Sequence, residues 1–315
     1  MQTNIAQNVG VDVCKATLDV YLHPAGTARQ FTNDAKGMRA LLDWLGDRDV
    51  ARVVFEPTGR YHHDFERRLG SAGLSLAKVN PRQARRFAEA IGCNAKTDAV
   101  DAAMLARMGA LLELPSRPMV SETLDEMKEL HVARLGLVKD RTAAKNREHV
   151  CRSPLLKRHT AQRLAQIDRQ IAAIEVELKA SLSREPHLSA RFNVLVSIPG
   201  IGEITAIAML IEMPELGTLD SKQVASLAGL APIARDSGQH RGKRHIRGGR
   251  AELRHALYMP ALVASRFNAD MKHKYGALIA AGKPPKVAIT AIMRKLVILA
   301  NSLVKAGRNW TPKRA

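Results

Sequence analysis

A single aspartate, Asp12, lies inside a short apolar run and constrains what this part of the chain can fold into. The run, residues 8–13 (Asn-Val-Gly-Val-Asp-Val), predicts a buried β-strand. An ionised carboxylate within such a strand costs free energy unless other groups compensate its charge. Coordination of a metal ion would remove that cost, so the other carboxylates of the chain become candidate metal ligands.

Three further carboxylates have the placement that such a site needs. Glu56 ends a second apolar run, residues 53–56, and Pro-Thr-Gly follows it. Asp98 and Asp101 are three residues apart at the start of a predicted helix, which puts them on one face of it. Acids at two strand ends and on a helix face suit one or two Mg²⁺ ions, with Mn²⁺ as a substitute, because hard cations prefer oxygen ligands. The chemistry that this predicts is cleavage or transfer of a phosphodiester.

Each acid also has a structural interpretation. Asp98 suits a helix N-cap, and Asp101 a first-turn partner for the helix dipole. Glu56, before its turn, suits an exposed strand end. For any one of these acids alone the structural interpretation is favoured. The position of Asp12 within an apolar strand favours metal binding for the set.

Residues 1–117 alternate strand and helix patterns, as an α/β domain does, and Pro115 and Pro118 mark its end. A hairpin, a crossover helix, further strands and a late helix with two acids follow the order of the RNase H-like (RuvC-like) fold, in which such acids converge. The predicted strands are residues 8–14, 17–22, 52–56 and 74–79, with Phe31 in a further strand, and the predicted helices are residues 34–44, 61–72, 81–91 and 98–112.

Residues 118–190 predict a helical connector. Apolar residues recur at three- and four-residue steps, the pattern of a coiled-coil seam, and they are Leu164, Ile167, Ile171, Ile174 and Leu178. An earlier helix covers residues 122–150, and Ser153-Pro154 separates the two. The pair is either an intramolecular helical hairpin or a dimerisation arm, and the pattern favours neither.

Residues 191–315 hold 20 Lys and Arg against 7 Asp and Glu, most of the excess that gives the chain its net charge of +19. This concentration predicts a polyanionic partner. Pro199, Gly200, Ile201 and Gly202 form a turn between apolar helices that is typical of a helix-hairpin-helix element, whose backbone N–H groups bind a phosphate. A plain packing corner between helices has a similar pattern.

A glycine-rich basic tract follows, suited to bidentate phosphate contacts. Its cations are Arg235, Arg241, Lys243, Arg244, Arg247, Arg250 and Arg254. Ser237 lies in Asp-Ser-Gly, and local spacing alone favours a turn serine. His240 and His245 are near it in the sequence, but nothing local identifies a nucleophile. Residues 285–303, with Val287, Ile289, Ile292, Met293, Leu296 and Leu299, predict an amphipathic helix that closes the core, so this part is mainly α-helical.

Composition predicts a cytoplasmic protein with no membrane partner. Cys14, Cys93 and Cys151 are odd in number and widely spaced, which indicates ordinary reduced thiols. No apolar run approaches the roughly 20 residues that a membrane span needs. The first residues lack the pattern of a secretory signal.

Several motifs together carry a resemblance to a known family. They are Val-Gly-Val-Asp at 9–12, Glu-Pro-Thr-Gly at 56–59, Lys-Thr-Asp-Ala-Val-Asp-Ala at 96–102, Ser-Ile-Pro-Gly-Ile-Gly at 197–202, Gly-Leu-Ala-Pro at 229–232 and Leu-Arg-His-Ala-Leu-Tyr-Met-Pro-Ala at 253–261. In this order they resemble the DEDD transposases of bacterial insertion sequences, which are bridge-RNA-guided recombinases and relatives of the pilin-gene invertases. The resemblance implies a RuvC-like catalytic domain (1–117), a coiled-coil connector (118–190) and a transposase domain (191–315).

The resemblance also implies roles for particular residues. Asp12, Glu56, Asp98 and Asp101 match the acidic metal-binding tetrad, and Ser237 matches the catalytic serine, with Asp236 before it as a mild variation. The implied enzyme is a Mg²⁺-dependent DNA transposase that forms a phosphoserine–DNA intermediate on target and donor DNA. It implies a structured guide RNA and a homodimer or homotetramer whose active site combines two domains, from one or two protomers.

Three rival functions remain open from the sequence. A RuvC-type metal-dependent nuclease would hydrolyse DNA with the serine incidental. A site-specific DNA invertase would act without RNA guidance. A non-catalytic nucleic-acid-binding protein would use its acids only as caps and ion-pair partners.

Overall fold

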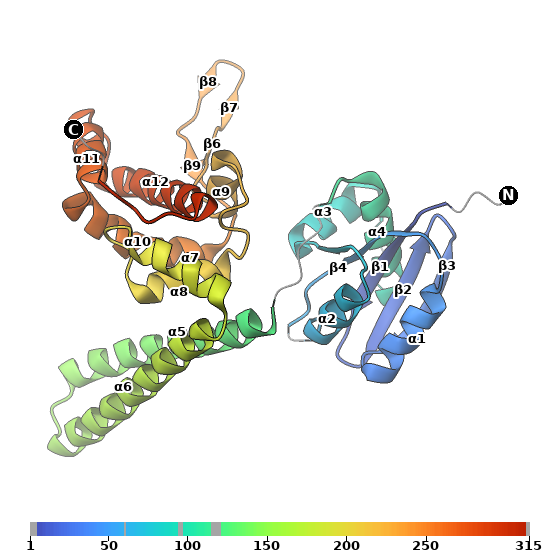
Figure 1. Cartoon of the computed structure of the whole chain (residues 1–315), viewed down its shortest axis with the longest axis horizontal. Coiled ribbons are helices and arrows are strands. Elements are labelled where there is room, and N and C mark those ends of the chain that lie inside the picture. Colours follow the sequence, from blue (N-terminus) through green and yellow to red (C-terminus); the bar gives the residue numbers. More distant parts are fainter. Residues whose placement is uncertain (1–4, 60, 94–96, 115–120, 313–315) are drawn as a thin grey trace. The chain divides into compact units, whose positions relative to one another are not determined.

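The chain forms two compact units, Met1–Val120 and Ser121–Ala315, in a computed structural model that describes residues 5–59, 61–93, 97–114 and 121–312 (Figure 1). The first unit is an α/β domain and the second is mostly helical. The predicted domain end at Pro115 and Pro118, and the boundary between residues 117 and 118, lie outside the described residues.

The first unit contains a five-stranded mixed sheet in the order β3-β2-β1-β4-β5. The strands are β1 (Gln7–Val13), β2 (Thr17–His23), β3 (Thr27–Thr32), β4 (Val50–Phe55) and β5 (Leu76–Lys78). β1, β2 and β3 pair antiparallel, whereas β1, β4 and β5 pair parallel. The predicted strands are all present, with β5 shorter than expected and Glu56 one residue beyond the end of β4.

Four helices accompany the sheet, close to the predicted ranges. They are α1 (Ala35–Leu45), α2 (His63–Ser71), α3 (Pro81–Ala90) and α4 (Asp98–Leu111). Asp34 caps α1 by accepting a hydrogen bond from the Gly37 N–H at 2.8 Å, and Pro81 opens α3 as its first residue. Helix α2 begins two residues later than predicted because the Tyr61 N–H instead closes a turn onto the Thr58 carbonyl.

The two faces of the sheet carry different helices. Val9, Val11 and Val13 pack in one cluster with residues of α1 and α2. The other face meets α3 and α4, and there Val54 packs in a second cluster with residues of both helices. Side chains alternate along a strand, so Gly10 and Asp12 face α4.

Gly10 lets α4 lie directly on β1. A Cβ atom at this position would collide with the Ala102 carbonyl oxygen and the Ala106 nitrogen of α4. Only a residue without a side chain permits this approach. The first turn of α4, with its two aspartates, is thereby brought to the end of β1.

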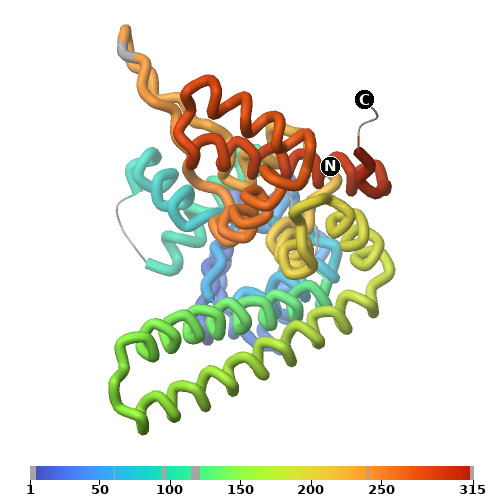
Figure 2. Tube along the Cα trace, turned by 90° about the vertical axis from the view of Figure 1, so that its left-hand side faces the viewer, coloured from blue at the N-terminus to red at the C-terminus, as the bar shows by residue number. Residues whose placement is uncertain are grey.

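The second unit begins with a long antiparallel helical hairpin, α5 (Glu122–Val150) and α6 (Pro154–Ser183) (Figures 1 and 2). Ion pairs cross it between Arg134 and Glu175 (2.7 Å) and between Arg141 and Asp168 (3.2 Å). Of the predicted seam, Ile167, Ile171 and Leu178 are buried and Leu164 and Ile174 are half-buried. The seam therefore packs within the chain, and its use as a dimerisation arm stays a prediction.

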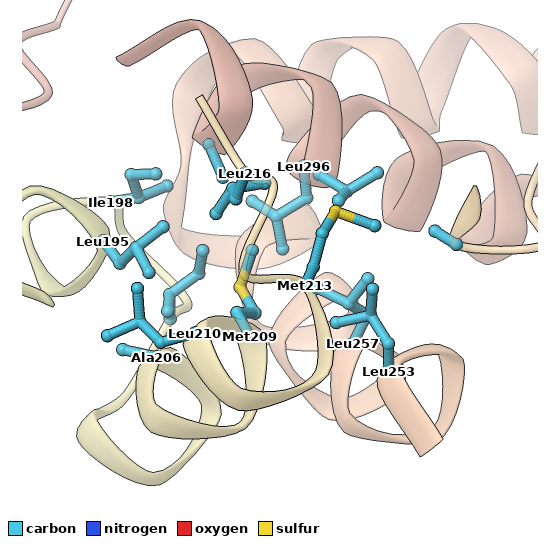
Figure 3. Packing of buried hydrophobic residues seen from close by; sticks show 14 of the residues in the cluster. Leu195, Ile198, Ala206, Met209, Leu210, Met213, Leu216, Leu253, Leu257 and Leu296 are labelled. Carbon is cyan, nitrogen blue, oxygen red and sulfur yellow. The ribbon is translucent and has the colours of Figure 1, made fainter. Parts of the chain in front are cut away.

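Six further helices surround the core of the second unit. They are α7 (Pro186–Val196), α8 (Glu203–Glu212), α9 (Ser221–Leu227), α10 (Ala251–Phe267), α11 (Ala269–Ala280) and α12 (Pro285–Ala306). Leucine and methionine side chains from α8, α10 and α12 meet in this core (Figure 3). Helix α12 closes it as predicted through Ile289, Ile292, Met293 and Leu296. Val287 was expected to join them but is 53% exposed, because it lies on the helix face of the half-buried Ala291 and Arg294, whereas Ala288 and Ile289 beside it are buried.

Helix α12 is also the one helix in the described part of the chain that is long and apolar enough to cross a membrane, with a mean hydropathy of 1.7. This corrects the expectation that no apolar run approaches that length. Half of its apolar stretch is buried inside the unit, and core helices of soluble proteins can be as long and as apolar. Length and composition alone are therefore weak support for a membrane span.

A β-ribbon projects from the helical body, where the sequence predicts only a basic loop (Figures 1 and 2). Its strands are β6 (Pro232–Ile233), β7 (Asp236–Ser237), β8 (His240–Arg241) and β9 (His245–Ile246). β6 pairs with β9 and β7 with β8, both antiparallel. Gly238, with φ of 54°, opens the two-residue turn at the end, which suits a tight hairpin.

Candidate active site

The end of β1 and the start of α4 bring acidic side chains together. Ligand atoms of Asp12, Cys14 and Asp98 all lie within 4.8 Å of one another. Thr97 caps α4 by accepting a hydrogen bond from the Val100 N–H at 3.3 Å, which fixes the turn that carries Asp98 and Asp101. The structure thus unites Asp12 and Asp98 as the sequence predicts.

The electrostatics of Asp12 show how much negative charge collects here. Its pKa is raised from 3.8 to about 6, first by burial and then by the charges of Asp98, Asp101 and Asp19. The Cys14 thiol, which donates a weak hydrogen bond to Oδ2 of Asp12 at 3.8 Å, acts in the opposite direction. A divalent cation would relieve this accumulation of charge, so the donor set fits a hard metal ion.

Glu56 reaches the same edge of the sheet from β4. The parallel register pairs Val11 with Phe55, and Asp12 and Glu56 are the next residues on the two strands. Glu56 is half-buried. Among the described residues, the closest group of ligand atoms contains Cys14 in place of Glu56 and Asp101. The structure therefore brings Asp12 and Asp98 together, with Asp101 close enough to raise the pKa of Asp12, and it places Glu56 at the neighbouring strand end, outside that close group of ligand atoms.

Two side chains at this site, Cys14 and Asp19, have no role in the sequence-based interpretation. Asp19 lies opposite Asp12 in the β1–β2 register, and its Oδ2 is buried without a hydrogen-bond partner among the described residues. Cys14 was expected to be an ordinary thiol, but its pKa is raised by burial and by Asp12, Asp98 and Asp19. The two-residue spacing of Cys14 from Asp12 is the sequence signal that could have indicated the contact.

Asn33 connects the segments that follow β1 and β4. Its side-chain amide donates to the Cys14 carbonyl oxygen at 2.7 Å and to the Tyr61 carbonyl oxygen at 3.0 Å. One side chain therefore ties the segment after Asp12 to the segment after Glu56. No sequence pattern marks Asn33, because both of its partners are backbone groups distant in the chain.

A half-buried ion pair lies beside the segment after β4, on the opposite face of the sheet. Lys78 contacts Glu66 at 2.5 Å and His62 Nε2 at 3.3 Å. The pKa of His62 is lowered to about 4, first by burial and then by Lys78 and His63. His62 is therefore neutral near pH 7 and accepts the hydrogen bond from Lys78.

Ser237 lies on the β-ribbon, next to its turn. It is exposed, and it lines a pocket with Arg235, Gly242, Lys243 and His245. Gly242 packs against the Arg235 backbone, so a side chain there would collide with it. The pocket that Ser237 lines therefore also carries cationic and protonatable side chains, which suits the binding of a phosphate.

The predicted basic tract divides into two groups. Arg235, Arg241, Lys243, Arg244 and Arg247 are exposed. The guanidinium of Arg250 instead forms a two-point ion pair with Glu215 at 2.7 Å, and Arg254 donates to the Gly248 carbonyl oxygen at 2.6 Å. The exposed group is available to nucleic acid, whereas these two arginines hold the fold together.

The turn between α7 and α8 serves mainly to pack helices. A Cβ atom at Gly200 would lie 2.8 Å from the Pro260 carbonyl oxygen, and its φ of 105° also favours glycine. Ile201 is buried in the core, and Pro199 is half-buried. Gly202 is exposed at the N-terminus of α8. The packing-corner interpretation explains Gly200 and Ile201, and phosphate binding at this turn stays a prediction.

Comparison with known proteins identifies the family. Residues 193–276 match the family described as the IS116/IS110/IS902 transposases, and residues 9–151 match a DEDD transposase family of the IS110 type. The pilin gene-inverting protein of Moraxella bovis is 30% identical over 317 residues, which cover 95% of this chain and 96% of that protein. The chain belongs to the IS110/IS116/IS902 transposase family.

Further relatives agree with this membership. The pilin gene-inverting protein of Moraxella lacunata is 30% identical with the same coverage. A 43.6 kDa protein of insertion element IS110 from Streptomyces coelicolor is 29% identical over 150 residues, which cover 47% of this chain and 36% of that protein. The resemblance to DEDD transposases is confirmed. As a member of the IS110 family the chain is a DNA transposase or recombinase whose acidic residues bind a divalent metal ion.

Proposed function

We propose that this transposase cuts and rejoins DNA with a serine nucleophile, Ser237, and a metal-binding tetrad. The tetrad is Asp12, Glu56, Asp98 and Asp101, and the metal is Mg²⁺, one or two ions, with Mn²⁺ as a substitute. The observation that carries the proposal is the convergence of acids from a strand and a helix, since ligand atoms of Asp12 and Asp98 lie within 4.8 Å of each other. The raised pKa of Asp12, about 6, is the electrostatic consequence of this convergence in a partly buried place.

The topology of the first unit supports an RNase H-like, RuvC-like catalytic domain. Its sheet order, β3-β2-β1-β4-β5, combines an antiparallel hairpin pair with two parallel strands, and α4 crosses β1 with acids in its first turn. The proposal divides the chain into this domain (1–117), a coiled-coil connector (118–190) and a transposase domain (191–315).

The reaction at the serine transfers a DNA phosphoryl group from a sugar oxygen to Ser237 Oγ. Ser237 Oγ gives up its proton and forms a bond to phosphorus, while the bond to one sugar oxygen breaks and that oxygen takes up a proton and leaves as a hydroxyl. The phosphoserine link keeps the bond energy, so a second sugar hydroxyl can reverse the step and rejoin DNA. Arg235 and Lys243, which line the same pocket as Ser237, would bind the phosphate oxygens. When bound, the divalent cation would neutralise charge on the phosphoryl and leaving oxygens.

Serine and acids belong to different units of the chain, which suggests a composite active site from one or two protomers. Exchange of strands between DNA molecules requires several such sites, so the proposal includes a homodimer or homotetramer. Target and donor DNA would bind the exposed arginines of the ribbon. A structured guide RNA would read sequence by base pairing while the protein contacts phosphates, in the cytoplasm.

One observation favours a second function, inversion of DNA, and the alternative that we propose is an invertase that acts without RNA guidance. Two relatives that align over almost the whole chain are named pilin gene-inverting proteins. A recombination assay without the RNA distinguishes the two functions. An invertase recombines inverted DNA sites with protein and metal alone, whereas the guided recombinase requires RNA.

The test is a denaturing gel of the full chain incubated with Mg²⁺, DNA and the RNA transcribed from the flank of the element. Wild type should give a protein–DNA band that survives denaturation, and Ser237→Ala should give none. Ser302→Ala, which alters an exposed serine on α12, is the matched control and should behave as wild type. Continued cleavage by Ser237→Ala without an adduct would support a RuvC-type nuclease instead.

A further inference from the structure

Cys14 gives the acidic site a sulfur donor that a purely hard-cation site does not need. Its Sγ lies 3.8 Å from Oδ2 of Asp12, and the ligand atoms of Asp12, Cys14 and Asp98 lie within 4.8 Å of one another. Two ligands of one tetrahedral zinc ion, a thiolate and a carboxylate oxygen, are separated by about 3.6 Å, given Zn–S and Zn–O bonds of about 2.3 and 2.1 Å. The donors of Asp12 and Cys14 are thus already near the spacing that a shared cation requires, and that of Asp98 lies within 4.8 Å of both.

The backbone around Cys14 holds the thiol in this position. Its N–H donates to the Thr17 carbonyl oxygen at 2.9 Å, and its carbonyl oxygen accepts from the Asn33 amide at 2.7 Å. On the neighbouring strand, Oδ2 of Asp19 is buried without a hydrogen-bond partner among the described residues. A cation beside Asp12 would compensate the charge of that buried oxygen as well as those of the other two acids.

We propose that Cys14 is a further metal ligand, which makes this a mixed carboxylate–thiolate site that binds thiophilic divalent cations such as Zn²⁺ and Cd²⁺ more tightly than Mg²⁺. Thiolates select soft and borderline cations, whereas carboxylates alone favour hard ones. On binding, the thiol proton passes to solvent and the Sγ–metal bond forms without any change of oxidation state. Zn²⁺ would therefore displace Mg²⁺ from the site. The inference rests on the proposed metal site and not on the chemistry of Ser237.

Cadmium titration of the full chain tests this, because a cadmium–thiolate bond gives an ultraviolet charge-transfer band that needs no enzymatic activity. The protein is the double variant Cys93→Ser, Cys151→Ser, which keeps Cys14 as its only thiol. We expect the band to appear at one cadmium per chain and to disappear when Cys14→Ser is added. Asp98→Asn in the same background should weaken cadmium binding by roughly tenfold or more, since loss of even a residue that only supports a ligand costs about that much.

A thiol-reactive disulfide reagent gives a second readout on the same protein. Saturating Zn²⁺ should slow its reaction with Cys14, whereas the same concentration of Mg²⁺ should not. Absence of the cadmium band from the folded Cys14-only protein, or an unchanged band after Asp98→Asn, would overturn the inference. A cadmium band without any Ser237–DNA adduct would support the Cys14 ligand and contradict the proposed function. An adduct without the band would support the proposed function and contradict the Cys14 ligand.

Discussion

At the scale of the residue, Asp12 is the acid of the proposed metal site whose pKa is raised. Without a cation its pKa is raised to about 6, so folding favours the protonated carboxyl. A raised folded-state pKa means that stability is highest below the unfolded pKa of about 3.9 and is lost as the pH rises through 6. Metal-free protein should therefore become less stable over this range.

Asp12→Asn should remove that dependence. In chelator at about pH 7.5, we expect the variant to be more stable than wild type by about 1–2 kcal/mol, a value reduced from the full shift because Asp12 is partly exposed. Near pH 4 the two proteins should be alike. Added Mg²⁺ should raise the stability of wild type and not of the variant. Urea denaturation at both pH values measures this, and a variant that is less stable at pH 7.5 in chelator would contradict the account.

At the scale of the element, the contact between β1 and α4 places the acids. Gly10→Ala would put a methyl group against backbone atoms of Ala102 and Ala106, which cannot move away as a side chain does. We expect a loss of about 3 kcal/mol or more in the free energy of unfolding, at or above the upper end for overpacking. Gly136→Ala in α5, where no atom lies within 4 Å of the added carbon, should instead stabilise by about 0.5–1 kcal/mol. Equal effects of the two substitutions would contradict this packing.

Asn33→Leu tests the tie between the segments that carry Asp12 and Glu56. Two carbonyl groups lose their donor, so we expect a loss of about 1–3 kcal/mol and weaker metal binding. Gln83→Leu, an exposed amide on α3, is the control and should change neither. Calorimetric titration with Mn²⁺ provides the measurement. If Asn33→Leu binds Mn²⁺ as tightly as wild type does, the hydrogen bonds of Asn33 do not position the metal site.

Elements with a clear period could be predicted from the sequence, and short ones could not. The apolar runs of β1 and β4 and the seam of α6 were long enough to predict these elements. The β-ribbon was missed because strands of two residues have no period to detect, and its cations resemble a loop. Asp19 and Cys14 were missed for another reason. Asp19 comes close to Asp12 only through the β1–β2 register, which no single segment reveals, and the two-residue spacing of Cys14 from Asp12 does not by itself show that Asp98 of α4 joins them.

At the scale of the whole molecule, the chain separates its charges. The acids of the metal site lie in the first unit, whereas residues 191–315 carry a net charge of +13. Burial decides which of these cations can bind DNA. Arg241 and Arg244 on the ribbon are exposed, whereas Arg250 is engaged with Glu215.

Salt dependence of DNA binding should distinguish these arginines. Arg241→Ala and Arg244→Ala should each reduce the slope of log affinity against log salt by about 1, with little change in stability. Arg250→Ala should lower stability by about 2–3 kcal/mol, since it leaves Glu215 without this partner, and change the slope less. Fluorescence anisotropy across a salt series, with thermal melts of each variant, measures both quantities. A reduction of the slope by about 1 in Arg250→Ala would contradict the distinction between exposed, DNA-binding arginines and structural ones.

Mass spectrometry of the protein–DNA adduct is the most direct test of the central claim. The full chain reacts with DNA, RNA and Mg²⁺, nuclease trims the DNA, and the digested protein is searched for a peptide that carries a nucleotide. The account predicts the nucleotide on Ser237 in wild type, and no adduct in Asp12→Asn or in chelator. DNA cut by the wild-type protein in Mg²⁺ without any modified peptide, or with the nucleotide on another residue, would contradict it.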